Sequence, residues 1–319
     1  MTQVARWGWV LLFLLVAALA VQVNVHRRRV FILHEGQASQ PATRAFFRGI
    51  DAILQQQPRI NERSQFLGSD PDACRQALSQ LRACQPGAVI AEGLQAHRCI
   101  AREASGAALQ PLTQPALNDS EAARAAFIAA WATVLADLAP PAGAVTLVQA
   151  DDRDAWAESD LLAAAARKAG LELRLLVVAT GAELRAGLQG ELDEAVGLVI
   201  VGHTVDQDAE NGQDLALRAL FSTLRAATAL PIVATRLDSV RLGADLALAQ
   251  APEQRGEQLA YGARHGRTLD ASGPAQPLEM AVGLHADFAN RWGARLPSFY
   301  SASARLAGLL YEPHKSHSP

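Results

Sequence analysis

Charged, polar and aromatic residues follow the apolar, strand-like segments of this chain, where a parallel sheet would present them to a ligand. In an open α/β sheet, ligands lie in the crevice beyond the carboxyl ends of the strands. In the first part of the chain, the residues at such positions are His34, Glu35, Gln37, Glu92, Gln95 and Thr113. In the second part they are Asp152, Asp154, Trp156, His203, Thr204, Asp206, Arg236 and Asp238. These fourteen positions are the predicted ligand-binding residues.

The chemistry of these side chains suits a small zwitterionic molecule. Arg236 can bind a carboxylate through two parallel hydrogen bonds, and Asp152 or Asp238 can bind an ammonium group. Among the histidines, His203 is the strongest candidate for ligand contact because it follows a strand directly. Backbone amides at helix starts are alternative partners for two of the acidic residues, Glu35 and Glu92.

Structural roles are equally open for several candidates in the second part of the chain. Asp152 and Asp154 could cap the helix that contains Trp156. Trp156 itself could pack in a core rather than stack on a ligand. Asp238 could form a salt bridge with Arg241 instead of meeting a ligand.

The chain contains no recognisable catalytic motif. It has no His-Glu-x-x-His pair, no Gly-x-Ser-x-Gly turn and no phosphate-binding loop of the GxxxxGK type. His34 with Glu35, or His203 with Asp206 and Asp208, could form acid–base pairs or metal ligands, but no further motif supports either. The sequence therefore predicts a binding protein without cofactor or metal, and an α/β enzyme with an unrecognised site is the alternative.

The candidate residues are positioned by alternating strand-like and helical segments. Strands are expected at residues 30–34, 64–68, 88–93, 108–113, 144–150, 171–178, 198–202, 231–235, 241–250 and 278–283. Helices are expected at residues 43–57, 121–139, 156–169, 182–192, 213–228 and 252–265. Gly170 should terminate the helix that precedes it.

This order predicts an α/β protein of two lobes, each with a parallel sheet flanked by helices and joined by several hinge crossovers. Residues 30–116 and 239–277 are expected to form the first lobe. Residues 117–238 and 278–319 are expected to form the second.

Residues 1–29 are expected to be a signal peptide or an N-terminal membrane anchor. Arg6 precedes an apolar run from Trp7 to Val21, and Ala18-Leu19-Ala20 fits a signal peptidase site. Cleavage after Ala20 would release a soluble periplasmic protein. An uncleaved segment over residues 7–25 would anchor it to the inner membrane.

The composition argues against one class of partner and does not decide whether the cysteines form a disulfide. A formal charge of -3 argues against nucleic-acid binding. Cys74, Cys84 and Cys99 match no zinc-binding spacing. In an oxidising periplasm one pair could form a disulfide and leave one thiol, or all three could be small buried residues.

Three segments resemble one family. AARKAGLELRLLVVATGAELRAGLQGELDEAVGLVIVGHTVD (165–206) is similar to a helix–Gly–strand–helix–strand run, and PIVATRLDSVRLGADLALAQAPEQRGEQLA (231–260) contains a Val-Arg-x-Gly-Ala motif. ANRWGARLPSFY (289–300) is similar to an ending with Gly-x-x-Leu-Pro. Across residues 30 to 312 the chain resembles the ABC transporter substrate-binding proteins of the tryptophan/tyrosine type, which have the type 1 periplasmic binding protein fold.

The resemblance implies a monomeric, extracytoplasmic protein that captures a small molecule, such as an amino acid, between two lobes for an ABC permease. A membrane-anchored accessory protein that senses the ligand for a signalling system is the alternative. The chain departs from the family at HEGQASQ (34–40), at EGLQA (92–96) and at His203-Thr204, where the family has a polar Asp-Asn pair. The resemblance therefore transfers the fold more firmly than the ligand.

Overall fold

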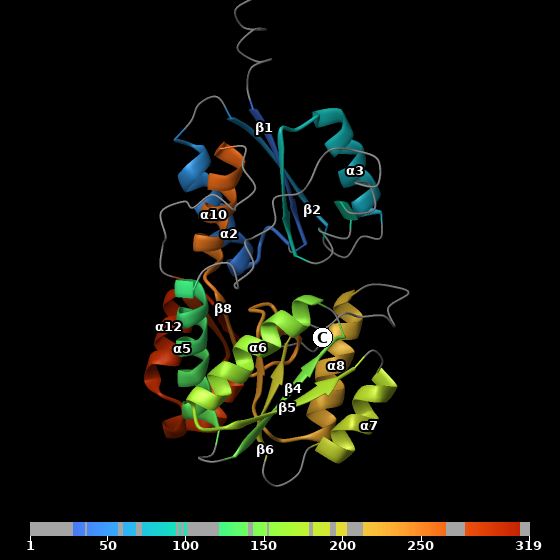
Figure 1. Ribbon diagram of the computed structural model, residues 1–319. Coiled ribbons are helices and arrows are strands. Elements are labelled where there is room, and N and C mark those ends of the chain that lie inside the picture. The colour runs from blue at the N-terminus through green and yellow to red at the C-terminus, as the bar shows by residue number, and fades with distance from the viewer. Residues whose placement is uncertain are drawn as a thin grey trace, which may run out of the picture. The chain divides into compact units, whose positions relative to one another are not determined.

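The computed structural model describes residues 28–35, 37–56, 60–67, 72–93, 96, 99–100, 121–139, 143–151, 153–178, 181–191, 196–202, 213–265 and 278–312. The chain divides into two compact units (Figure 1). The first unit consists of Met1–Ala38, Phe47–Gln114 and Gly256–Ala271. The second consists of Ser39–Phe46, Pro115–Arg255 and Ser272–Pro319. The boundary between the units falls inside two helices, α2 (Pro41–Leu54) and α10 (Pro252–His265).

The first unit is built on a three-stranded parallel sheet of order β2-β1-β3. Its strands are β1 (Arg28–His34), β2 (Ile60–Phe66) and β3 (Ala88–Glu92). Phe31 and Leu33 alternate with Val30 and Ile32 along β1, and all four are buried. Phe31 and Leu33 pack against α3 (Ala73–Cys84), and Figure 1 shows α2 and α10 on the other side of the sheet. Burial on both faces explains the continuous apolar run of β1.

A disulfide joins Cys74 of α3 to Cys99, with the two Cα atoms 5.7 Å apart. Cys84, at the end of α3, is a free thiol. The structure thus selects one of the pairings that the sequence left open.

The second unit contains a seven-stranded sheet of order β10-β9-β8-β7-β6-β4-β5. Its strands are β4 (Ala144–Gln149), β5 (Glu172–Val177), β6 (Val196–Val201), β7 (Ile232–Ala234), β8 (Leu246–Gln250), β9 (Met280–His285) and β10 (Leu310–Tyr311). The helices are α5 (Glu121–Leu138), α6 (Arg153–Lys168), α7 (Gly181–Glu191), α8 (Gln213–Ala227), α9 (Ser239–Leu242), α11 (Ala286–Trp292) and α12 (Ser298–Leu306), with a 3-10 turn, η2 (Gly293–Arg295).

Alternate residues of each central strand enter two different cores. Leu198 and Ile200 of β6 pack in a core with α5, α6, α11 and α12, whereas Val199 and Val201 pack in a core with α7, α8 and α9. In Figure 1, α5, α6 and α12 accordingly lie on one side of the sheet, and α7 and α8 on the other. This two-sided burial explains the apolar runs from which the sheet was predicted.

The end of α6 shows how sequence alone fixes a boundary. Gly170 has a φ of +75°, a left-handed conformation that glycine adopts without strain. The Leu171 amide then donates a 2.9 Å hydrogen bond to the Ala166 carbonyl oxygen, and the Gly170 amide donates to that of Arg167. The predicted stop at Gly170 is confirmed.

The pair β8–β9 is antiparallel, which differs from the expectation of wholly parallel sheets. Gln250, at the end of β8, lies opposite Met280, at the start of β9. β9 therefore begins at the end of the sheet where β8 finishes, and the two strands run in opposite directions. In a βαβ crossover the connection would instead return to the other end of the sheet, and the two strands would be parallel.

Three further predictions from the sequence differ from the structure. The strand expected at residues 241–250 is α9 followed by β8, because Gly243 has a φ of +133° and interrupts the segment. The strand expected at 64–68 is β2, which starts earlier, at Ile60. Residues 239–255 lie in the second unit rather than in the first lobe, because β8 pairs with both β7 and β9.

The strand expected at 108–113 falls outside the described residues, as does the predicted N-terminal segment over 1–27. In the part of the chain that is described, no helix is both long enough and apolar enough to cross a membrane.

Candidate functional site

The carboxyl ends of the three strands in the first unit bring Phe66, His34 and Glu92 into one row. The register places His34 opposite Phe66 on β2 and opposite Glu92 on β3. The His34 carbonyl oxygen accepts a 2.9 Å hydrogen bond from the Leu67 amide, and the Glu92 carbonyl oxygen accepts one of 2.9 Å from the Glu35 amide. The parallel pairing thus continues past the strands and fixes the backbone of this edge.

His34, Phe47 and Phe66 form an aromatic cluster at this edge. The His34 ring centroid lies 5.9 Å from that of Phe47 and 6.0 Å from that of Phe66, and the two phenylalanine rings are 5.4 Å apart. These spacings suit tilted aromatic packing. His34 is buried, whereas Phe47 and Phe66 are half-buried. Part of the cluster is therefore available to a molecule at the edge.

Glu35 packs closely against the backbone of Gly93. A Cβ built on Gly93 would lie 2.3 Å from Glu35 Oε2 and 2.6 Å from Glu35 Cβ. Gly93 also has a φ of +93°, which side chains rarely adopt. Glycine is therefore required here for Glu35 to lie against the end of β3. Gln37, in contrast, is exposed.

In the second unit, Gln149 is the last residue of β4, and Gly202 and Thr235 directly follow β6 and β7; the three strands are neighbours in the sheet. Two backbone hydrogen bonds link these strand ends, from the Gly202 amide to the Val148 carbonyl oxygen (3.0 Å) and from the Thr235 amide to that of Val201 (3.1 Å). These three residues form the carboxyl edge at the middle of the sheet.

Glu158 of α6 reaches this edge. Its Oε2 accepts a 3.2 Å hydrogen bond from the Thr235 hydroxyl and would lie 3.1 Å from a Cβ at Gly202. The absence of a side chain at Gly202 therefore leaves room for a carboxylate above the end of β6. A carboxylate and a hydroxyl together can bind an amino or hydroxyl group of a ligand.

Gln149 is a buried amide at the end of β4, and only 1% of its surface is exposed. Its Nε2 has no hydrogen-bond partner among the described residues. A buried donor without an acceptor costs about 1–3 kcal/mol of folding free energy. The amide is thus a donor that an acceptor brought to this edge could satisfy.

Trp156 lies on α6 with 43% of its surface exposed, so it is not a core residue. Its indole nitrogen donates a 2.9 Å hydrogen bond to Asp151 Oδ1, which orients the ring. Of the two roles considered from the sequence, core packing is not the one observed.

Arg236 and Asp238 bind each other in the loop between β7 and α9. Arg236 donates from Nη2 to Asp238 Oδ2 at 2.8 Å and from Nε to Oδ1 at 3.3 Å. Burial raises the pKa of Asp238, but the Arg236 charge and its hydrogen bonds, together with the Arg255 charge, outweigh burial and lower it. The two groups predicted to bind a ligand carboxylate and ammonium are therefore paired with one another.

The remaining predicted residues lie outside the described part of the chain. They are Gln95, Thr113, Asp152, His203, Thr204 and Asp206, and Asp154 belongs to α6 but its side chain is not described. Among the described residues, no group of histidine, cysteine, aspartate and glutamate side chains could hold a metal ion.

The structure adds candidate site residues that were not predicted from the sequence: Phe47, Phe66, Gln149, Glu158 and Thr235. Phe66 and Gln149 are the last residues of β2 and β4, so correct strand ends would have identified both. Phe47 and Glu158 lie inside helices, where helical spacing alone cannot separate a core or surface residue from a site residue.

No family model matches the chain, and no curated protein matches it. The solved structures include a conserved domain protein from Vibrio cholerae, with a TM-score of 0.53 and 13% identity over 87% of this chain and 98% of that one. They also include an ABC domain in complex with L-Trp from Streptococcus pneumoniae, with a TM-score of 0.53 and 14% identity over 86% of this chain and 98% of that one. At these identities the likeness concerns the fold, which is the expected type 1 periplasmic binding protein fold.

Proposed function

We propose that the protein is an extracytoplasmic solute-binding protein that captures a small molecule at the carboxyl edges of its sheets and delivers it to an ABC permease. The observation that carries the proposal is the aromatic cluster of His34, Phe47 and Phe66. Two of its rings are half-buried at the edge where α/β sheets bind ligands. Such rings offer apolar area at low conformational-entropy cost.

The polar groups of the second unit support a ligand with hydrogen-bonding substituents. Gln149 supplies a buried amide donor, and Glu158 with Thr235 supplies a carboxylate and a hydroxyl. The tryptophan complex of the streptococcal neighbour makes L-tryptophan the first ligand to test.

The disulfide supports the proposed compartment. Disulfides persist in the periplasm and other oxidising environments and are rare in the cytosol. Cys74–Cys99, in the first unit, agrees with export directed by the apolar segment that precedes Ala20.

The experiment is a thermal-shift screen of amino acids, purines, sugars and small anions, followed by calorimetry on each hit. A ligand at a hundredfold excess over its Kd should add about 2.7 kcal/mol to the free energy of unfolding. Phe66→Ala should weaken binding by about tenfold, because it removes aromatic contact area and the pairing of the two phenylalanine rings.

Phe299→Ala is the matched control. Phe299 is an aromatic residue of α12 with 49% of its surface exposed, and its ring packs on Tyr300 rather than on a sheet edge. Binding should be unchanged in this variant. A folded protein that responds to no member of the panel, or that binds equally well after Phe66→Ala, contradicts the proposal.

A further inference from the structure

A cavity of about 200 Å³ lies at the opposite edge of the second unit's sheet, where strands β7 and β8 begin. Its lining includes the charged residues Arg225, Asp245, Arg291 and Arg295, with Phe288 and Trp292 beside them. We call it the arginine cavity. It belongs to none of the strand ends that carry the predicted ligand-binding residues.

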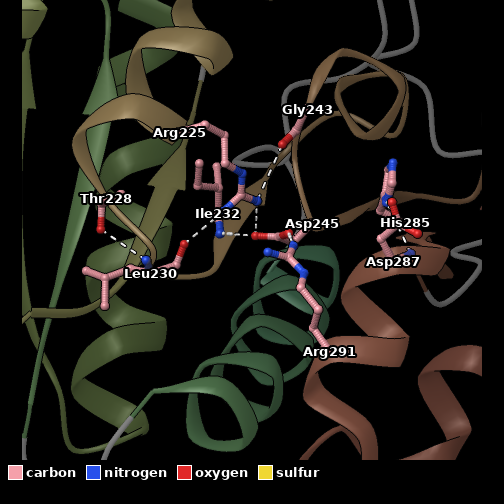
Figure 2. A network of polar contacts seen from close by, with 9 residues as sticks. All are labelled: Arg225, Thr228, Leu230, Ile232, Gly243, Asp245, His285, Asp287 and Arg291. Carbon is pink, nitrogen blue, oxygen red and sulfur yellow. Dashed lines mark hydrogen bonds and ion pairs between the residues drawn. The ribbon is translucent and has the colours of Figure 1, made fainter. Parts of the chain in front are cut away.

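Asp245 is the anchor of the arginine cavity, and only 3% of its side chain is exposed. Its Oδ2 accepts a 2.8 Å hydrogen bond from the Ile232 amide and pairs with Arg225 of α8. Its Oδ1 accepts a 2.9 Å hydrogen bond from Arg291 of α11. Figure 2 shows the two guanidinium groups reaching the carboxylate from different helices.

Arg225 makes further hydrogen bonds in this arrangement. Besides Asp245, it donates to the Leu230 carbonyl oxygen at 3.1 Å and to that of Gly243 at 3.5 Å. These bonds tie the end of α8 to the segments that precede β7 and β8. Arg225 therefore supplies a fixed positive charge and holds the wall of the cavity.

Arg291 and Arg295 are differently placed. The Arg291 side chain is 60% exposed, and Asp245 Oδ1 is its one acceptor among the described residues. Arg295 is exposed on η2 and forms no ion pair with any other described residue. Both retain N–H donors at the mouth of the arginine cavity.

The charges do not balance within the cavity lining. Three arginines face one aspartate. The carboxyl ends of α8 and α11 each add a partial negative charge of roughly half a unit, which leaves the lining positive by about one charge. Guanidinium groups bind oxyanions through paired N–H donors, and the cavity has room for one such group.

We infer that the arginine cavity binds an oxyanion of the phosphate or sulfate type, held by Arg291 and Arg295 and attracted by the fixed charge of Arg225. The site is separate from the proposed ligand site at the carboxyl edges. It places an anion-binding site of the second unit where β7 and β8 begin.

The test is calorimetric titration of the purified protein with inorganic phosphate at low ionic strength, with sodium chloride as the blank titrant. The double variant Arg291→Gln/Arg295→Gln should weaken phosphate binding by at least about tenfold, because it removes two guanidinium groups and the loss of one hydrogen bond to a charged group already has about that effect. Added salt should weaken binding to the unmodified protein, because these charges are partly exposed.

Arg305→Gln is the matched control, since Arg305 is an exposed arginine of α12 outside the cavity lining. It should leave phosphate binding unchanged. The single variant Arg295→Gln provides the same test if the double variant does not fold, because the Arg295 side chain has no described partner whose loss could unfold the protein.

Three results would overturn the inference: no phosphate binding, equal binding by the double variant, or equal weakening by Arg305→Gln. Phe66→Ala should not change phosphate binding. A failure of the anion site is therefore distinguishable from a failure of the proposed solute site.

Discussion

The Tyr300 hydroxyl donates a 2.7 Å hydrogen bond to Asp137 Oδ2, which joins α12 to α5 across a sequence separation of 163 residues. Tyr300 is fully buried in the core that contains Trp131 and Phe288. The bond gives the buried hydroxyl its acceptor. It is one of the contacts that hold α12 to the other elements of the second unit.

Tyr300→Phe should lower the free energy of unfolding by about 1 kcal/mol, the usual net contribution of one hydrogen bond. Burial raises the pKa of Tyr300, and the hydrogen bond to Asp137 and the negative charge of Asp137 raise it further. Because the pKa is raised in the folded state, the neutral phenol stabilises the fold below pH 10, and this stabilisation is lost as the pH rises further. Denaturant titrations at pH 8 and above pH 10 should show a smaller alkaline loss in Tyr300→Phe than in the unmodified protein.

Tyr311 should contribute to the same alkaline loss. Burial and the Asp238 charge raise its pKa to about 12, despite the opposing charge of Arg241. Stability should fall between pH 10 and pH 12, and Tyr311→Phe should flatten that part of the profile. An unchanged profile in both tyrosine variants would show that neither phenol is held neutral by the fold.

Gly202→Ala should disturb the carboxyl edge that the ends of β4, β6 and β7 form. The added Cβ would lie 3.0 Å from Leu147 Cδ1 and 3.1 Å from Glu158 Oε2, so both side chains must move. We expect a loss of about 1 kcal/mol in the free energy of unfolding, and weaker binding of any ligand that uses Glu158. Gly190→Ala, where an added Cβ meets nothing within 4 Å, is the control for a glycine-to-alanine change in itself.

Asp238→Asn should reduce stability modestly at neutral pH, by at most about 1 kcal/mol, because both side chains of the ion pair are partly open to solvent. The Asp238 side chain is 43% exposed, and its pKa is lowered by Arg236. A carboxylate whose pKa is lowered by folding stabilises the protein at pH values above its unfolded pKa of roughly 4. This stabilisation is lost as the pH falls through the pKa of the folded state. The two proteins should therefore converge in acid, and a constant difference at every pH contradicts the ion-pair explanation.

Reduction of Cys74–Cys99 should destabilise the first unit. Closing a loop of 25 residues contributes about 3.5 kcal/mol to stability in the chain-entropy model. Cys74→Ser should have the effect of reductant, whereas Cys84→Ser should have little. Peptide mapping without reductant should recover the Cys74–Cys99 pair, and recovery of a pair with Cys84 would contradict the structure.

The N-terminus separates the transport and sensing interpretations. N-terminal sequencing of the exported protein should give Val21 if residues 1–20 form a signal peptide. A mature chain that starts at Met1 and sediments with membranes would favour the anchored sensory protein.

The sequence by itself determined the alternation of strands and helices over most of the described residues, the two-sided burial of the strands and the stop at Gly170. These are properties of a few consecutive residues, because apolar runs and a left-handed glycine act locally. The sequence also placed polar residues at the ends of two strands of the first unit, and so anticipated His34, Glu35 and Glu92 at one edge of the first sheet.

Only the tertiary structure decided which distant groups meet. Phe47 joins Phe66, Glu158 reaches Thr235, and Asp245 gathers Arg225 and Arg291. The antiparallel direction of β9 and the choice of cysteine partner were decided in the same way. Each depends on contacts between segments brought together by packing of the whole sheet, and no local pattern of residues encodes such a contact.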